Sequence, residues 1–528
     1  MTFATTHTVS LHGAVGHLID VQTDVSPGQV GVTMVGRADT TINEARDRVR
    51  MAIVNSQLAW PATRRITILL SPADLLKRGT HFDLAIAISV LAAAGVVPST
   101  EIVATAFVGE LTLDGNLRSV TGVLPMVLAA AERGIGAVFV PEPQAAEAQM
   151  VPDMSVVGVR SLAQVVAVLR GERPPEAAPV APTSGARLLA WRGQERRDEL
   201  DLADLVGIAD ARFAVEVAAA GGHHLLLSGP KGCGKTSLVE RIPGILPDLT
   251  PEEALELSAI QSLAGTLDPV AGFPTRPPFS APHHDASKAS LIGGGAGVVR
   301  PGEVSKAHTG VLFLDEFPLF RADVIEALRQ PLENGDVTIA RRDESVTLPA
   351  RGMVVLAANP CPCGDFSTDV GRSPCTCRPV QLREYRTKVT GPVADRVDIV
   401  RHLRQLRRSD GDKDLVRPES SADVRRRVEA ARQRQAERYA AESWRLNGHA
   451  PGPVLRERWP LSRAGQAMVD EQLYAGRLSR RGATRVHRLA WTVADLRGRD
   501  EPALDEVDTA LRLRTGDPLL LSMLERAG

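Results

Sequence analysis

A glycine-rich loop between an apolar run and a helical pattern is the stretch of this sequence that is best suited to chemistry. The loop reads GPKGCGKT from residue 229 and fits the phosphate-loop pattern G-x-x-x-x-G-K-[ST]. Its glycines let backbone N–H groups close around phosphate oxygens, and the following helix adds its positive dipole end. Lys235 is expected to reach the β- and γ-phosphates, and the Thr236 hydroxyl to bind Mg²⁺. The residues predicted to contact the nucleotide are Gly229, Pro230, Lys231, Gly232, Cys233, Gly234, Lys235, Thr236 and Ser237.

Two further groups with catalytic potential follow buried-strand patterns downstream of this loop. The apolar run 311–314 is followed by Asp315 and Glu316. Asp315 is expected to hold Mg²⁺, directly or through water, and Glu316 to orient and deprotonate the attacking water. A strand predicted over 353–358 ends at Asn359, whose amide can hydrogen-bond the γ-phosphate or that water. Together with the loop, these residues predict hydrolysis of ATP with Mg²⁺.

A cluster of four cysteines is the candidate for a second metal. Four thiolates in two C-x-C pairs could bind Zn²⁺ tetrahedrally, although structural zinc sites more often use C-x-x-C. Free thiols in a loop and a redox role are the alternatives. The adjacent histidines at 283 and 284 are expected to pack in a loop, because neighbouring side chains of an extended segment point in opposite directions. The four cysteines are Cys361, Cys363, Cys375 and Cys377.

The composition restricts the classes of protein that need to be considered. The chain has 528 residues, a formal net charge of −1 and ordinary apolar content, so any surface that binds nucleic acid must be local. The N-terminal segment lacks a basic region followed by an apolar one, which argues against a secretory signal. No apolar run reaches the length of a membrane span. Clustered cysteines do not resemble a secreted disulfide framework, and we expect a cytoplasmic protein without a membrane partner.

The pattern of strands and helices predicts an α/β multidomain protein. Residues 1–170 alternate between strand-like and helix-like segments, and residues 171–198 are rich in Pro, Ala and charge, which favours a semi-rigid linker. Residues 199–416 carry the phosphate loop in an α/β core, and residues 417–528 read as helical. In the first region the expected elements are helices at 40–55, 81–94 and 125–133 and strands at 66–70, 105–111 and 137–140.

Long stretches of the chain resemble the magnesium-chelatase-like AAA+ proteins of the ComM/YifB group. They are FSAPHHDASKASLIGGGAGVVRPGEVSKAHTGVLFLDE, RQPLENGDVTIARRDESVTLPARGMVVLAANPCPCG and LSRRGATRVHRLAWTVADL. The resemblance spans essentially the whole chain and implies an AAA+ P-loop core, a C-terminal helical lid and assembly into a homo-oligomeric ring, with a hexamer expected.

The N-terminal region resembles the α+β protease-type domain of Lon. The stretch FVGELTLDGNLRSVTGVLPMVLAAAERGIGAVFVP, residues 107–141, carries this resemblance. Proteolysis of the Lon type needs a serine and a lysine. The corresponding positions here read GTHFD, residues 79–83, and GVL, residues 122–124, so a non-proteolytic scaffold is expected.

The AAA+ resemblance also implies roles for single residues. Asn359 would act as sensor 1, and Arg481, in LSRRG, as sensor 2. Arg396, in GPVADRVD, would act as an arginine finger that stabilises transition-state charge in the neighbouring subunit's nucleotide. The alternative for Arg396 is an ion pair within its own chain, with Asp395 or Asp398.

The same resemblance implies a ring that translocates on branched or single-stranded DNA and drives branch migration in recombination or transformation. Arg341 and Arg342, at the tip of a predicted hairpin over 338–347, and Arg300, in a glycine-rich insert, are the candidates for contacts with DNA phosphates. A solvated turn is the alternative for the hairpin tip. Arg485 and Arg488 are expected at the lid surface or facing DNA. The motor subunit of a metal chelatase and a protein-remodelling ATPase stay open as other functions.

Overall fold

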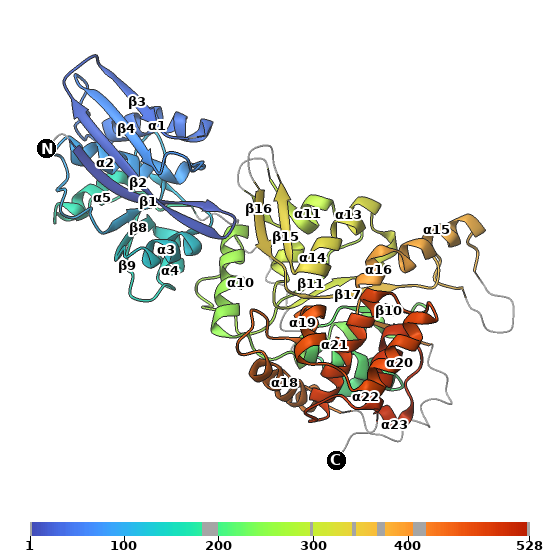
Figure 1. Cartoon of the computed structure of the whole chain (residues 1–528). Coiled ribbons are helices and arrows are strands. Elements are labelled where there is room, and N and C mark those ends of the chain that lie inside the picture. Colours follow the sequence, from blue (N-terminus) through green and yellow to red (C-terminus); the bar gives the residue numbers. More distant parts are fainter. Residues whose placement is uncertain are drawn as a thin grey trace.

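Two α/β regions and a set of C-terminal helices follow one another along the chain (Figure 1). The computed structural model describes residues 3–37, 39–181, 199–295, 299–340, 345–366, 375–404 and 419–524. Among the helices in these ranges, none has the length and apolar character needed to cross a membrane.

The N-terminal region is built on a seven-stranded sheet with the order β3-β4-β2-β1-β5-β8-β9. Strands β1, β2 and β4 pair antiparallel, whereas β5, β8 and β9 run parallel to one another. Two hydrophobic cores form, one with α1, α2 and α5 and one with α3 and α4. The strands are β1 (Phe3–His12), β2 (Val15–Ser26), β3 (Gly31–Val35), β4 (Arg65–Ser71), β5 (Thr105–Phe107), β8 (Ala137–Pro141) and β9 (Ser155–Val159). The helices are α1 (Thr40–Asn55), α2 (Asp83–Ala93), α3 (Val123–Glu132), α4 (Ala145–Ala148) and α5 (Leu162–Leu169).

Most elements expected in this region are present, and one differs for a clear reason. The helix expected over 40–55 is α1 with the same bounds, capped by the Asp39 carboxylate, which accepts from the Ile42 N–H. The strand expected over 105–111 is divided into β5 and β6 (Glu110–Leu111), which pairs with β7 (Leu117–Arg118). Between them the Gly109 N–H donates to the His81 carbonyl instead of to a neighbouring strand, so the strand is interrupted there.

The first part of the stretch expected to be a linker lies against the N-terminal region. Val180 is buried in its core. The Ser119 hydroxyl donates to the Ala181 carbonyl at 2.6 Å, and the Gln164 amide donates to the Pro175 carbonyl at 2.8 Å. Residues 182–198 of the same stretch lie outside the described residues.

The second region is built on a five-stranded parallel sheet with the order β11-β14-β17-β10-β18. The strand bounds predicted for residues 311–314 and 353–358 are those observed. Parallel strands end at the same edge of a sheet, so the residues that follow β10, β14 and β17 meet there. The strands are β10 (Leu225–Ser228), β11 (Phe279–Ser280), β14 (Val311–Leu314), β17 (Met353–Ala358) and β18 (Ile399–His402). The expected hairpin is β15 (Asp336–Ala340) paired with β16 (Ser345–Pro349).

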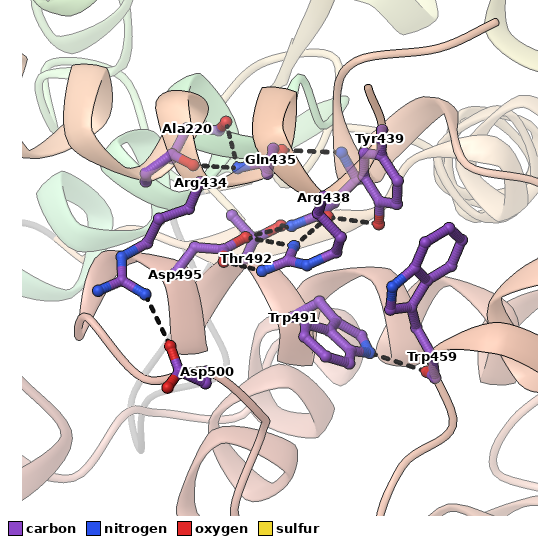
Figure 2. A network of polar contacts seen from close by, with 12 residues as sticks. Ala220, Arg434, Gln435, Arg438, Tyr439, Trp459, Trp491, Thr492, Asp495 and Asp500 are labelled. Atoms are coloured by element: carbon purple, nitrogen blue, oxygen red, sulfur yellow. Dashed lines mark hydrogen bonds and ion pairs between the residues drawn. The ribbon is translucent and has the colours of Figure 1, made fainter. Parts of the chain in front are cut away.

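The C-terminal helices are fixed to the second region by a buried polar network (Figure 2). Arg438 pairs with Asp495, and the Gln435 side chain donates to the Ala220 carbonyl at 3.1 Å. Ala220 lies in α7 (Ala209–Gly221), directly before the phosphate-loop strand. These helices therefore pack on the element that leads into the candidate site. The longest are α18 (Ser421–Arg438), α20 (Arg463–Tyr474), α21 (Arg480–Leu496) and α22 (Leu504–Thr515).

The N-terminal sheet meets the second region at helix α10 (Pro251–Ala264) and at the β15–β16 hairpin (Figure 1). On α10, the Ser262 hydroxyl donates to Glu147 of α4, whose carboxylate also accepts from the Leu124 N–H at 2.8 Å. At the β1–β2 turn, Gly13 has φ +63°, and a Cβ there would lie 2.7 Å from Val346 of β16. Only glycine allows this close approach.

Candidate active site

The phosphate loop lies between β10 and α8 (Lys235–Val239), as its sequence pattern requires. Gly232 and Gly234 have φ of +73° and +88°, which side chains rarely tolerate. A Cβ on Gly229 would lie 2.6 Å from the Leu403 carbonyl, so glycine is needed for close packing at the start of the loop. Positive φ angles at two glycines are typical of loops whose backbone N–H groups bind an anion.

Lys235 is held at the centre of the site. The residue is 7% exposed, and its ammonium donates to the carbonyls of Gly229 and Pro230 at 2.6 and 2.9 Å. It also donates to Asn359 Oδ1 at 3.1 Å. The charge is thus fixed between the loop and the end of β17, where it can meet the phosphates of a nucleotide.

The two carboxylates after β14 make different contacts. Asp315 Oδ2 accepts from the Thr236 hydroxyl at 3.1 Å, so the two groups expected to hold Mg²⁺ are adjacent. Glu316 Oε1 accepts from the Asn359 amide at 3.1 Å. The Glu316 backbone has φ +49°, which is uncommon for a residue with a side chain and turns Glu316 away from the direction of the strand.

This arrangement has the parts needed for transfer of a phosphoryl group to water. The structure brings together the predicted residues Lys235, Thr236, Asp315, Glu316 and Asn359, which come from the segments that follow β10, β14 and β17. Thr236 and Asp315 supply hard oxygen ligands of the kind that Mg²⁺ takes. Glu316 and Asn359 lie next to each other where they can orient a water molecule in line with a γ-phosphate.

The two predicted arginines meet at a different carboxylate. Arg396, which is 8% exposed, and Arg481, whose side chain is 58% exposed, bind the same oxygen of Glu333 at 3.1 and 3.3 Å. Glu333 lies in α14 (Arg329–Asn334). The two carboxylates considered as intrachain partners of Arg396 bind other arginines: Asp395 pairs with Arg514, and Asp398 pairs with Arg485.

The expectation that Arg485 and Arg488 lie on the surface is wrong. Arg485 is buried, pairs with Asp398 at 3.2 Å and donates to the Arg396 carbonyl at 2.9 Å. Arg488 donates to the Ala450 carbonyl at 2.8 Å, and burial lowers its pKa. Burial acts to raise the pKa of Asp398, but the surrounding cations, led by Arg485, lower it overall. Both arginines face inward because buried carbonyls and a carboxylate are available to bind them.

The four clustered cysteines converge in space. Sγ–Sγ distances are 3.2 Å for Cys361 and Cys363, 3.5 Å for Cys363 and Cys375, and 3.6 Å for Cys375 and Cys361. The ligand atoms of these three and of Cys377 all lie within 4.8 Å of one another. The N–H of Asp365 and the Cys361 thiol lower the pKa of Cys363 to about 6, whereas the pKa values of the other three thiols are raised, so the geometry rather than the acidity of the thiols is the argument for a metal site. The donor set therefore fits a tetrahedral zinc ion.

The adjacent histidines do not point in opposite directions as expected. The ring centroids of His283 and His284 are 4.1 Å apart, and both rings approach the Asp285 carboxylate, at 3.2 and 3.6 Å. The extended geometry fails because the chain turns at this point, with the Ala286 N–H donating to the His283 carbonyl at 2.9 Å.

Of the residues expected to contact DNA, only Arg300 is described. It is exposed in the short strand β13 (Arg300–Pro301). Arg341 and Arg342 lie outside the described residues, between the two strands of the β15–β16 hairpin.

The positions that would carry proteolytic groups make structural contacts. Thr80 donates to Glu110, and the buried His81 ring binds the Val9 carbonyl at 2.8 Å. Asp83 pairs with Arg48 at 2.9 Å, and burial raises the pKa of Asp83 to about 6.

Two residues near the site are not predicted from the sequence. Glu333 joins Arg396 to Arg481, and the Tyr385 hydroxyl accepts from the Asn359 N–H at 3.2 Å. Glu333 lies in a stretch already singled out for its family resemblance, but neither residue has a spacing relative to the phosphate loop that could reveal its role.

Comparison with known protein families finds matches along most of the chain. The family described as "Magnesium chelatase, subunit ChlI" matches residues 201–410. "Subunit ChlI of Mg-chelatase" matches residues 21–144, and "Magnesium chelatase, subunit ChlI C-terminal" matches residues 418–514. The three families thus match, in turn, the larger part of the N-terminal region, the phosphate-loop region and most of the C-terminal helices.

Three of the relatives match nearly the whole of this chain. An uncharacterized protein of Mycobacterium tuberculosis is 44% identical over 514 residues, which is 97% of this chain and 99% of the relative. The YifB protein of Escherichia coli is 37% identical over 527 residues, 99% of each chain. The competence protein ComM of Haemophilus influenzae is 36% identical over 502 residues, 95% of each chain. A magnesium-chelatase 67 kDa subunit of Chlorobaculum parvum is 29% identical over 162 residues, only 30% of this chain and 23% of the subunit.

Proposed function

The chain belongs to the ComM/YifB group of magnesium-chelatase-like AAA+ proteins, and on this premise we propose that it is an ATP-hydrolysing ring motor that acts on DNA. The observation that carries the ATPase part is the contact chain from Lys235 through Asn359 to Glu316, beside the Thr236–Asp315 pair. ATP is the substrate and Mg²⁺ its partner ion, held by Thr236 and Asp315.

The motor role is tested by steady-state ATP hydrolysis with and without branched DNA. We expect basal turnover that branched or single-stranded DNA stimulates, and movement of the branch point in a labelled four-way junction. The printed name of the Haemophilus influenzae relative, a competence protein, supports recombination or transformation as the setting. ATPase activity that ignores DNA would instead favour a chelatase motor or a protein remodeller.

Assembly into a ring, with six subunits expected, gives Arg396 and Arg481 their proposed roles. Both arginines bind Glu333, so their guanidinium groups lie side by side. Arg396 would reach across a subunit boundary and stabilise transition-state charge in the neighbouring subunit's nucleotide, and Arg481 would act as sensor 2. Arg396→Ala should therefore bind ATP but fail to hydrolyse it, whereas Arg383→Ala, an exposed arginine of α15 (Pro379–Thr390), should turn over normally.

A mixing experiment separates a role in the neighbouring subunit from a role within the same one. Mixed with Lys235→Ala protein, Arg396→Ala protein should regain activity, because one boundary then keeps a sound phosphate loop and a sound arginine. Activity that stays absent in mixed rings of verified composition would place the role of Arg396 within its own subunit.

For DNA contact we propose Arg341, Arg342 and Arg300. In a ring, the hairpin repeats its arginines around one axis, where they could bind phosphates without reading sequence. Replacing Arg341 and Arg342 with Ala should flatten the salt dependence of DNA binding and remove DNA-stimulated turnover, with basal turnover kept. The control removes equal charge from exposed C-terminal positions, Arg463 and Arg477. A hairpin variant that migrates branched DNA like wild type would contradict this assignment.

For the cysteine cluster we propose one structural Zn²⁺ per chain. Its support is the convergence of four sulfur atoms with distances typical of a compact thiolate site. Metal analysis of protein purified without chelator should find about one zinc per chain. Four freely titrating thiols and no metal would contradict the proposal.

We propose that the N-terminal region is a Lon-like scaffold without protease activity. In support, His81 and Asp83 are used in buried contacts with Val9 and Arg48. The helices after residue 420 would serve as the lid of the AAA+ core.

A further inference from the structure

The cysteine cluster and the nucleotide site share a short segment of chain. Cys361 is buried only two residues after Asn359, whose side chain bridges Lys235 and Glu316. Any movement of the first cysteine therefore shifts the end of β17, and with it the amide that joins the ammonium to the carboxylate.

The second pair of cysteines is joined to the same amide by another route. Helix α15 begins at Pro379, two residues after Cys377. Tyr385 of this helix is buried, and its hydroxyl accepts from the Asn359 backbone N–H at 3.2 Å. A metal ion bound by both pairs of cysteines would therefore restrain Asn359 in two ways, through the chain segment that leads to Cys361 and through Tyr385.

A third contact reaches the phosphate loop itself. Gly364, within the first cysteine turn, has φ +86°, and its N–H donates to the Cys361 carbonyl at 3.0 Å. A Cβ on Gly364 would lie 2.6 Å from Cε of Lys231 and less than 3 Å from two more of its carbons. The aliphatic stem of this phosphate-loop lysine thus lies directly on the cysteine turn.

The sulfur atoms are arranged to bind an ion with little rearrangement. In a tetrahedron with Zn–S bonds of about 2.3 Å, neighbouring sulfurs are separated by about 3.8 Å. The observed separations of 3.2 to 3.6 Å are slightly shorter. Backbone N–H groups of Cys363 and Phe366 donate to the sulfurs of Cys377 and Cys361 at 3.4 and 3.3 Å, which orients them as outer-sphere hydrogen bonds do in metal sites.

We propose that Zn²⁺ in this cluster is a positioning centre for ATP hydrolysis, which sets the place of Asn359 through Cys361 and Tyr385 and that of Lys231 through Gly364. The inference rests on the proposed ATPase function and on the proposed zinc site, and it adds a consequence for the reaction. The two routes predict different effects. The contact with Lys231 governs nucleotide affinity, whereas the contacts with Asn359 govern the catalytic step, because this amide lies against Glu316.

The first experiment removes the metal from full-length protein at a ligand of the second cysteine pair, which is more than 100 residues along the chain from the phosphate loop. Cys375→Ser should lose zinc, lower kcat by about 10-fold and weaken ATP binding severalfold, which is the scale seen when the support of a metal site is removed. Thr376→Ala, an exposed non-ligand in the same loop, should keep zinc and both constants. Cys375→His supplies another zinc ligand and should recover metal and turnover together. If Cys375→Ser does not fold, chelation and reloading of wild-type protein give the same comparison.

The second experiment separates the two routes. Tyr385→Phe removes only the hydroxyl that accepts from Asn359, so it should lower kcat with little change in the dissociation constant for ATP. In Lys231→Ala protein, removal of zinc should no longer weaken ATP binding, because the contact that transmits the effect is gone.

The possible results test the metal site and its positioning role separately. Protein that never contains zinc overturns the metal site itself. Protein that contains zinc but has the same kcat and ATP affinity with and without the ion overturns the positioning role, and leaves the ATPase and the metal site standing. Loss of zinc that lowers only the melting temperature likewise assigns the ion to folding alone.

Discussion

Replacing Glu316 with Gln should separate ATP binding from ATP hydrolysis. The amide has nearly the same size as the carboxylate, and its oxygen can still accept from Asn359, as Glu316 Oε1 does at 3.1 Å. The backbone at φ +49° and the hydrogen bond from the Glu316 N–H to Asp315 are unaffected, because Gln has the same Cβ. The Thr236–Asp315 pair and Lys235 also keep their contacts. The variant therefore removes the charge and basicity of one group and little else.

The size of the effect follows from that role. A positioned general base contributes about 10²- to 10⁴-fold. Turnover should fall at least ~100-fold, which corresponds to about 2.7 kcal/mol on the activation barrier. Phosphate release at saturating ATP and Mg²⁺ measures turnover, and a fluorescent ATP analogue measures affinity, which should stay near that of wild type.

A matched substitution controls for a general effect of removing one negative charge from the protein. Glu326→Gln makes the same chemical change on an exposed position of α13 (Ala322–Ala327) and should leave turnover unchanged. Near wild-type hydrolysis by Glu316→Gln, with normal affinity, would refute the assignment of Glu316 as the group that activates water.

The other predictions concern binding and stability. Lys235→Ala should abolish ATP binding, measured with the same analogue, because no other side chain in the loop places an ammonium against Asn359. Asp495→Ala leaves the buried guanidinium of Arg438 without its carboxylate and should destabilise the C-terminal helices by about 3–5 kcal/mol, seen as a lower melting temperature. Burial lowers the pKa of His223 to about 4 and of His449 to about 3, from the ordinary 6.5. Between pH 6.5 and these lowered values the unfolded chain binds more protons than the folded one. Thermal scans should therefore show that the contribution of these histidines to stability is full above about pH 6.5, falls as the pH drops from 6.5 to about 4, and levels off below about pH 3.

The elements and groups predicted well from sequence are those that local rules determine. The phosphate loop follows from glycine spacing between a strand and a helix, and the bounds of β14 and β17 follow from short apolar runs. The meeting of Glu316 with Asn359 was foreseeable because parallel strands end at one edge of the sheet.

The features that could not be predicted from the sequence depend on contacts between segments that are far apart in the chain or on local turns. Arginine is a residue type that usually lies at the surface. Arg485 is buried only because α21 packs close to Asp398, with which it pairs. Tyr385 acquires its role because α15 returns to the end of β17 after the cysteine loop. The histidines at 283 and 284 were misjudged because a turn replaces the extended geometry that was assumed.

The glycine turn that rests on the hairpin has a mechanical consequence. Gly13 approaches Val346 so closely that a Cβ on Gly13 would lie 2.7 Å from Cγ1 of Val346. A displacement of the hairpin at Val346 would therefore press on the β1–β2 turn, whose two strands belong to the seven-stranded sheet. A pair of dyes, one at the far edge of that sheet and one on the C-terminal helices, would report such a displacement as a change in the distance between them.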